Sequence, residues 1–158
     1  SSSAASDVYK RQQLFIMLLL VLTSCVQSNK VSDEGSRKIV ETFFVTYESA
    51  GAEKALNEIF ATNINFLKLP THSIDELREK LKSCENTMGK YFGYEIIAKR
   101  VIGKTIVHYS CIVNYELQPL RYSFTLYKPK DRWMLYNFKF DSELTNELDE
   151  SAKFYYIE

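Results

Sequence analysis

Three tyrosines and a phenylalanine fall at alternate positions of two neighbouring apolar segments, where they would share one face of a β-sheet. These residues are Tyr109, Tyr115, Tyr122 and Phe124, and Tyr47 lies on the apolar stripe of a preceding helical segment. Tyrosine hydroxyls at the wall of an apolar pocket can orient a ligand. Tyrosine is also common at the edge of a packed core. The five residues therefore predict either the lining of a pocket for a small apolar ligand or ordinary packing, and both interpretations stay open.

Acid–base chemistry would need a carboxyl group on this face, and the predicted inner face has none. An isomerase or dehydratase would hold a neutral carboxyl among apolar side chains. Glu95 and Asp141 lie near strand ends, and each is expected to be a solvated edge residue. His72 and His108 lack the spacing to Cys, Asp or Glu that a metal site needs. We therefore predict no catalytic residue, no metal site and no cofactor.

Cys84 and Cys111 are both expected to point inward, Cys84 from a helix and Cys111 from the sheet that this helix covers. A disulfide between them would close a loop of about 28 residues and stabilise the fold by roughly 3.5 kcal/mol through chain entropy. The alternative is two buried thiols that pack as small apolar groups. A bridge needs Cα atoms within about 7 Å of each other, which the sequence does not test.

These residues are carried by a predicted antiparallel sheet. Apolar and polar residues alternate along four consecutive segments separated by short turns, as expected of strands with one face on a core. Strict alternation fails in the first and fourth segments, which predicts a β-bulge near Tyr136 and Asn137 and a curved sheet. The predicted strands are residues 94–102, 105–116, 120–127 and 132–140.

Amphipathic segments ahead of the sheet predict three helices that cover one of its faces. Gly51 is expected to end the first helix, and Ser73 with Glu76 forms a capping box at the start of the third. The connector at 63–70 has room for a short strand, and the apolar tail at 154–157 is expected to dock on the domain. The predicted helices are residues 36–49, 52–61 and 73–88.

This order of elements resembles the nuclear transport factor 2-like superfamily. The most specific match is YKPKDRWML at residues 127–135, a polar turn followed by a tryptophan-containing last strand. The resemblance covers roughly residues 36–148 and implies an α+β fold in which three helices and a curved, four-stranded antiparallel sheet enclose a cone. The superfamily includes ketosteroid isomerase, scytalone dehydratase and many exported bacterial proteins, so the fold implies no single activity.

The N-terminal segment divides into parts of different origin. SSAASDVYKRQ, at residues 2–12, resembles the in-frame translation of a sequencing-library adapter, so the true start is expected to be missing. The apolar run that follows has the length of the hydrophobic region of a signal peptide and is too short to span a bilayer. We predict an adapter artefact at 1–12, a truncated lipoprotein signal peptide at 13–24, a polar tether at 25–35 and a single domain at 36–158.

The segment LTSC at residues 22–25 resembles the lipobox of bacterial lipoproteins. The resemblance implies cleavage before Cys25 and acylation of that residue, and two or more acyl chains anchor a protein stably. In that family an Asp after the acylated cysteine favours the inner membrane. Val26 takes that position here, so the resemblance implies an outer-membrane protein that faces the periplasm.

The charge of the chain argues against binding to nucleic acid. Removing residues 1–24 takes Lys10, Arg11 and Asp7 from the 20 basic and 20 acidic residues, which leaves 18 and 19. Nucleic-acid binding needs a basic patch, and the cluster at 128–132 is expected to be a solvated turn.

The sequence thus predicts a lipid-anchored, non-catalytic binding or accessory module. Its partners would be the membrane, through Cys25, and either a small apolar ligand or a protein. The alternatives are an isomerase-like or dehydratase-like enzyme that uses the cone, and a protein-interaction module that uses the outer sheet face or the C-terminal tail. A homodimer is left open.

Overall fold

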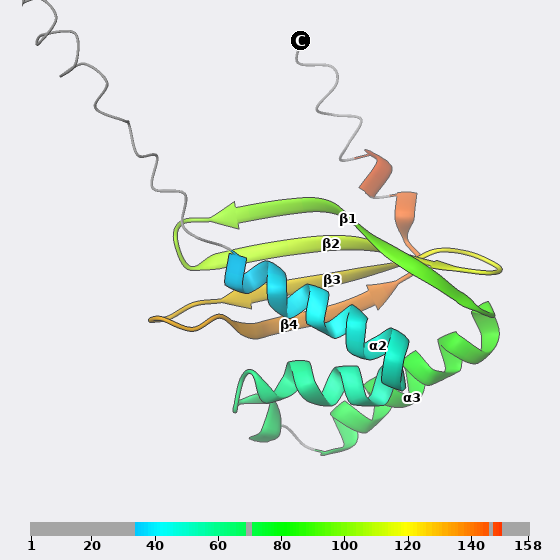
Figure 1. The fold of residues 1–158 in the computed structure, drawn as a ribbon, viewed down its shortest axis with the longest axis horizontal. Coiled ribbons are helices and arrows are strands. Elements are labelled where there is room, and N and C mark those ends of the chain that lie inside the picture. The colour runs from blue at the N-terminus through cyan, green and yellow to red at the C-terminus, as the bar shows by residue number, and fades with distance from the viewer. Residues whose placement is uncertain (1–33, 69–70, 146, 150–158) are drawn as a thin grey trace, which may run out of the picture. The chain divides into compact units, whose positions relative to one another are not determined.

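The computed structural model describes residues 34–68, 71–145 and 147–149, and these form an α+β fold (Figure 1). Four antiparallel strands lie in the order β1-β2-β3-β4, and a long helix crosses one face of the sheet. The α+β class and the four-stranded antiparallel sheet are confirmed. The elements are α2 (Glu34–Ala61), the short 3-10 helix η1 (Phe66–Lys68), α3 (Thr71–Met88), β1 (Tyr91–Ile102), β2 (Ile106–Tyr115), β3 (Leu120–Tyr127) and β4 (Met134–Asp141).

Helix α2 consists of two arms that meet at Gly51. This glycine has φ 84° and ψ 171°, a conformation open almost only to residues without a side chain. The two arms match the first two predicted helices, and the break falls where the glycine predicted it. The Thr46 hydroxyl on the first arm donates to Glu58 on the second at 2.7 Å, which ties the arms together.

Replacing Gly51 with alanine is expected to lower the free energy of unfolding by about 1–3 kcal/mol. A Cβ at this position would meet no atom within 4 Å, so the cost comes from the backbone conformation and not from a clash. Urea unfolding measures the loss, with the exposed neighbour Glu53→Ala as a control that should change stability by less than about 0.5 kcal/mol. An unchanged midpoint in Gly51→Ala would mean that the arms do not join in this conformation.

The irregular strands lie where the sequence predicted them. The pairing between β3 and β4 shifts by one residue at Tyr136, which returns Leu135 and Phe138 to the same buried face. The pairing between β1 and β2 shifts between Ile96 and Ala98. The β2–β3 pairing runs without a shift, so two regular strands stand between two bulged ones, as predicted.

Several element bounds differ from the predictions by one to three residues, and β4 begins at Met134 where residue 132 was predicted. Helix α3 begins at Thr71, so Ser73 lies inside its first turn and the predicted capping box at its start is wrong. The described part of the connector holds η1 where a short strand was considered, and β1 begins three residues earlier than predicted, at Tyr91.

The core lies between the sheet and α2. Alternate residues of β2 and β3 are at most 6% exposed, and the Phe124 ring of β3 packs against Phe43 and Phe44 from the first arm of α2. Helix α3 packs against α2 and contributes Leu81, which is fully buried. Burying one large apolar side chain stabilises a fold by about 1.5–3 kcal/mol, so the burial of Phe43 and Phe44 holds the helix on the sheet.

Candidate functional site

The tyrosines predicted to line a pocket instead fill the interior. Tyr47, Tyr115 and Tyr122 are 4%, 6% and 0% exposed. Their hydroxyls form a chain in which Tyr47 bonds to Tyr115, and Tyr115 bonds to Tyr122 at 2.9 Å. Burial first, and then the neighbouring Tyr115, raises the pKa of Tyr122 far above its ordinary value. These hydroxyls therefore satisfy one another inside the protein.

The other two residues of the predicted lining are packed in the same way. Tyr109 is 1% exposed, and its hydroxyl bonds to that of Ser36, at the start of α2, at 2.9 Å. Phe124 is fully buried, with its ring centroid 5.1 Å from that of Phe43 and 5.7 Å from that of Phe44. Of the two interpretations that the sequence left open, packing describes all five residues.

The two carboxylates considered for catalysis lie on the opposite face of the sheet. Glu95 is exposed and accepts a bond from the Asn114 amide at 3.2 Å. Asp141 accepts a bond from Arg121 at 3.0 Å, so it is a half-buried, ion-paired residue where a solvated one was expected. Within the described ranges, no group of three or more His, Cys, Asp or Glu residues could hold a metal ion.

The cysteines follow the thiol alternative only in part, because Cys111 is buried and Cys84 is half-buried. No disulfide joins Cys84 and Cys111, both of which are thiols in the structure. Cys111 is fully buried on the inner face of β2, and burial raises its pKa to about 12. A thiol with so high a pKa is unreactive at neutral pH. Cys25 and the tail at 154–157 lie outside the described residues.

A polar cluster on the outer face of the sheet holds the segment that follows β4. Arg121 lies 3.0 Å from Asp141 and 3.7 Å from Glu147, and Ser110 donates to the same Glu147 oxygen at 3.1 Å. Burial, followed by the nearby cation of Arg100, lowers the pKa of His108, which bonds to Thr125 at 3.0 Å. This cluster is structural, because Arg121 joins β3 both to Asp141 at the end of β4 and to Glu147 in the segment after it.

The most distinctive charged surface lies where the β1–β2 turn and the β3–β4 turn meet. The Lys128 N–H donates to the Thr105 carbonyl at 2.8 Å, which joins the two turns directly. In the strand pairing, Ile102 lies opposite Ile106, and Tyr127 lies between Ile106 and Met134. We call this region the basic end, residues 99–106 and 127–134. Its charged residues are Lys99, Arg100, Lys104, Lys128, Lys130 and Arg132, with Asp131 the one acid.

An apolar row crosses the outer face at the basic end. Four of its members pair in turn across the four strands, and the adjacent residues Val107, Leu126 and Leu135 of β2, β3 and β4 are fully buried on the inner face. Ile102 is 64% exposed, and the bulged Tyr136 is 65% exposed with its ring against Tyr127. The row consists of Ile102, Ile106, Tyr127, Met134 and Tyr136.

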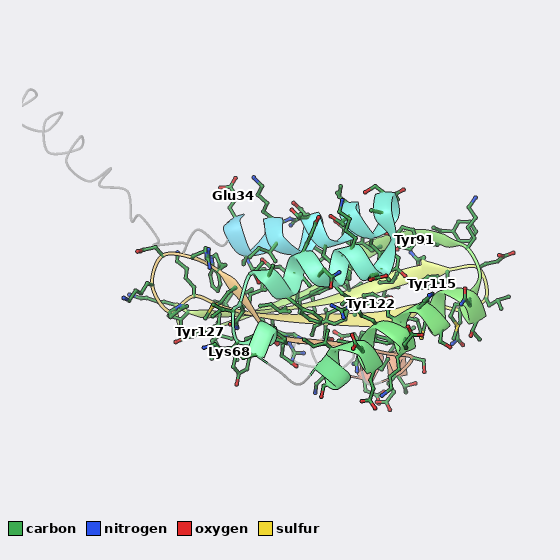
Figure 2. All side chains as sticks on the ribbon, turned by 90° about the horizontal axis from the view of Figure 1, so that it is seen from below. Glu34, Lys68, Tyr91, Tyr115, Tyr122 and Tyr127 are labelled. Carbon is green, nitrogen blue, oxygen red and sulfur yellow. The ribbon has the colours of Figure 1, made fainter. Side chains whose placement is uncertain are left out.

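The described chain begins beside this end. A Cβ on Gly35 would lie 3.2 Å from the Trp133 ring, so the first turn of α2 contacts the start of β4 closely. The Lys128 ammonium lies 5.6 Å from the centre of the same ring. A surface cleft of about 370 Å³ opens here between Gly35, Trp133 and Arg132. In Figure 2, Glu34 and Tyr127 lie toward one end of the molecule, and Tyr91 and Tyr115 toward the other.

Sequence reasoning missed this surface because it treated the cluster at 128–132 alone. In a meander, the first and third turns lie at the same end of the sheet, so the β1–β2 and β3–β4 turns pool their charges. The signal was available in the predicted strand order and in Lys104.

Comparisons with protein-family models, curated proteins and solved structures gave no significant match to this chain. Among the described residues, no helix is both long enough and apolar enough to cross a bilayer.

Proposed function

We propose that the chain is a lipid-anchored, non-catalytic accessory module of nuclear transport factor 2-like architecture, held through Cys25 at the periplasmic face of a bacterial outer membrane. The LTSC segment at 22–25 supports the anchor. Helices on one face of a four-stranded antiparallel meander, with a bulged last strand after a Lys-rich turn, support the architecture.

The observation that carries the non-catalytic part is the filled interior. An isomerase or dehydratase of this architecture would need a cone that admits a substrate and presents an acid to it. Here Tyr109, Tyr122 and Phe124 are at most 1% exposed, and Glu95 and Asp141 lie on the other face. A carrier of a small ligand inside the cone would need the same space. The module therefore acts through its surface.

Acylation of Cys25 provides the direct test of the anchor. The chain should be expressed from residue 13 with an initiator Met and a basic segment placed ahead of it. The mature protein is then expected in the membrane fraction, with an intact mass that includes acyl chains. Cys25→Ser is expected to abolish the acyl mass, since the sulfur that would be acylated is absent.

Cys84→Ser is the matched control, because it also removes one thiol and should keep both the acyl mass and the membrane location. A wild-type chain without acyl groups, or acylation that persists in Cys25→Ser, would overturn the anchor.

A further inference from the structure

We propose that the basic end and its apolar row form a docking surface for an anionic phospholipid bilayer. This inference rests on the proposed lipid anchor, which would bring the basic end close to a membrane. It assigns the domain a fixed orientation on the bilayer, in place of free movement on a tether.

Charge complementarity is the first argument. The basic end has six basic residues and one acidic residue, although the whole chain is formally neutral. The outer face farther along the sheet has the opposite bias, because Glu95, Asp141, Glu143 and Glu147 outnumber Arg121 and Lys139 there. Each Lys or Arg near an anionic membrane strengthens binding by roughly five-fold. The charge is thus segregated toward one end.

The apolar row supplies the second argument. Aliphatic and tyrosine side chains beside lysines are the usual composition of a surface that lies in the headgroup region, where the ring of tyrosine is favourable. Ile102 and Tyr136 are each about two-thirds exposed, at 64% and 65%. Their exposure to water is unfavourable in the free protein, and a bilayer would bury them.

The path of the chain supplies the third argument. Glu34 is nine positions after Cys25, so even a fully extended tether reaches at most about 30 Å. Gly35 lies against Trp133, at the basic end itself. A short tether that leaves the domain at this end would hold the basic end toward the membrane.

A second copy of the chain and a nucleic acid are the other occupants to consider. Two basic ends would repel each other, which disfavours a symmetric dimer through this surface. A nucleic acid would match the charge but would leave the aliphatic side chains of the row exposed to water. The bilayer is the partner that matches both.

The test uses the mature chain from residue 25 with Cys25→Ser, made without the apolar segment at 14–22, so that neither acylation nor that segment contributes to binding. Flotation should be measured with vesicles of about three parts phosphatidylcholine to one part phosphatidylglycerol, and with pure phosphatidylcholine vesicles. We expect binding to the mixed vesicles that weakens as salt increases, and much weaker binding to the neutral ones. Equal binding to both, or binding to neither, would overturn the proposal.

A triple variant locates the surface. Lys104→Gln, Lys130→Gln and Arg132→Gln together are expected to weaken binding to the mixed vesicles by about 100-fold. All three are exposed, and Lys128 is retained because of its contact with Trp133. Circular dichroism should show the same fold as the parent.

The matched control removes the same charge from the helices, through Lys54→Gln, Lys80→Gln and Lys82→Gln, which are exposed on α2 and α3. Its binding should stay within about three-fold of the parent. If both triple variants lose binding equally, net charge and not the basic end is responsible, and the proposal fails.

The outcome is separate from that of the anchor. A wild-type chain without acyl groups, together with vesicle binding by Cys25→Ser, would reject the anchor and retain the docking surface.

Discussion

Phe43→Ala is expected to lower the free energy of unfolding by about 4 kcal/mol. Phe43 is 2% exposed, and its ring centroid lies 5.1 Å from that of Phe124, 5.5 Å from that of Phe138 and 6.4 Å from that of Tyr122. Truncation would leave a cavity between α2 and the sheet that strands fixed by a hydrogen-bonded ladder cannot close. Urea unfolding of the Cys25→Ser chain measures the loss, with an unchanged m-value expected.

The control is Val45→Ala, two residues along the same helix. Val45 is 64% exposed, so its truncation should cost less than about 0.5 kcal/mol. A loss in Phe43→Ala that is no larger than in Val45→Ala would show that the interior is loosely filled. The cone would then be open to a small ligand, and the proposal of a surface-acting module would lose its main support.

Alkaline unfolding is the second large effect that we expect. Burial raises the pKa of Cys111 from 9.0 to about 12, and it raises the pKa of Tyr122 well above that of an unfolded tyrosine. The folded state thus holds these protons more tightly than the unfolded state. The corresponding stability is fully present below pH 9 and is lost as the pH rises through the folded pKa. For Cys111 the change from 9.0 to about 12 corresponds to about 4 kcal/mol at most.

Urea unfolding at a series of pH values between 8 and about 12 should therefore show a falling midpoint. Cys111→Ala removes the thiol and should flatten the part of the curve that begins near pH 9. Cys84→Ala is the matched control, since Cys84 is half-buried and is expected to leave that part of the curve steep. A Cys111→Ala curve parallel to the parent would mean that the Cys111 thiol ionises equally well in both states.

The sheet was predictable because its signals are local. In β2, every second residue faces the core, so burial follows directly from the alternation of apolar and polar residues. The bulge at Tyr136 was predictable for the same reason, since one extra residue is what lets an apolar strand change parity and keep the same face on the core. The break at Gly51 followed from the residue type alone.

The filled interior and the basic end were not predictable in this way. Whether Tyr122 lines a cavity or packs depends on how closely Phe43 and Tyr47, some 75 residues earlier, approach it, and no local pattern encodes that distance. The basic end depends on which turns become neighbours. That follows from the order of the strands, so it could have been predicted once a meander was assumed.

The strand order also determines which contacts close short loops and which close long ones. Each strand pairs with the strand next to it in sequence, so short turns close the whole sheet at little cost in chain freedom. The first arm of α2 makes two distant closures, where Ser36 meets Tyr109 and Tyr47 meets Tyr115 across 73 and 68 positions. Thr62 and Asn63, just after the second arm, make two more by bonding to the Leu135 backbone across 73 and 72 positions. Contacts within the sheet thus join residues close in sequence, whereas contacts between the helix and the sheet join distant ones. These helix–sheet contacts therefore account for most of the loop-closure entropy that is lost when the chain folds.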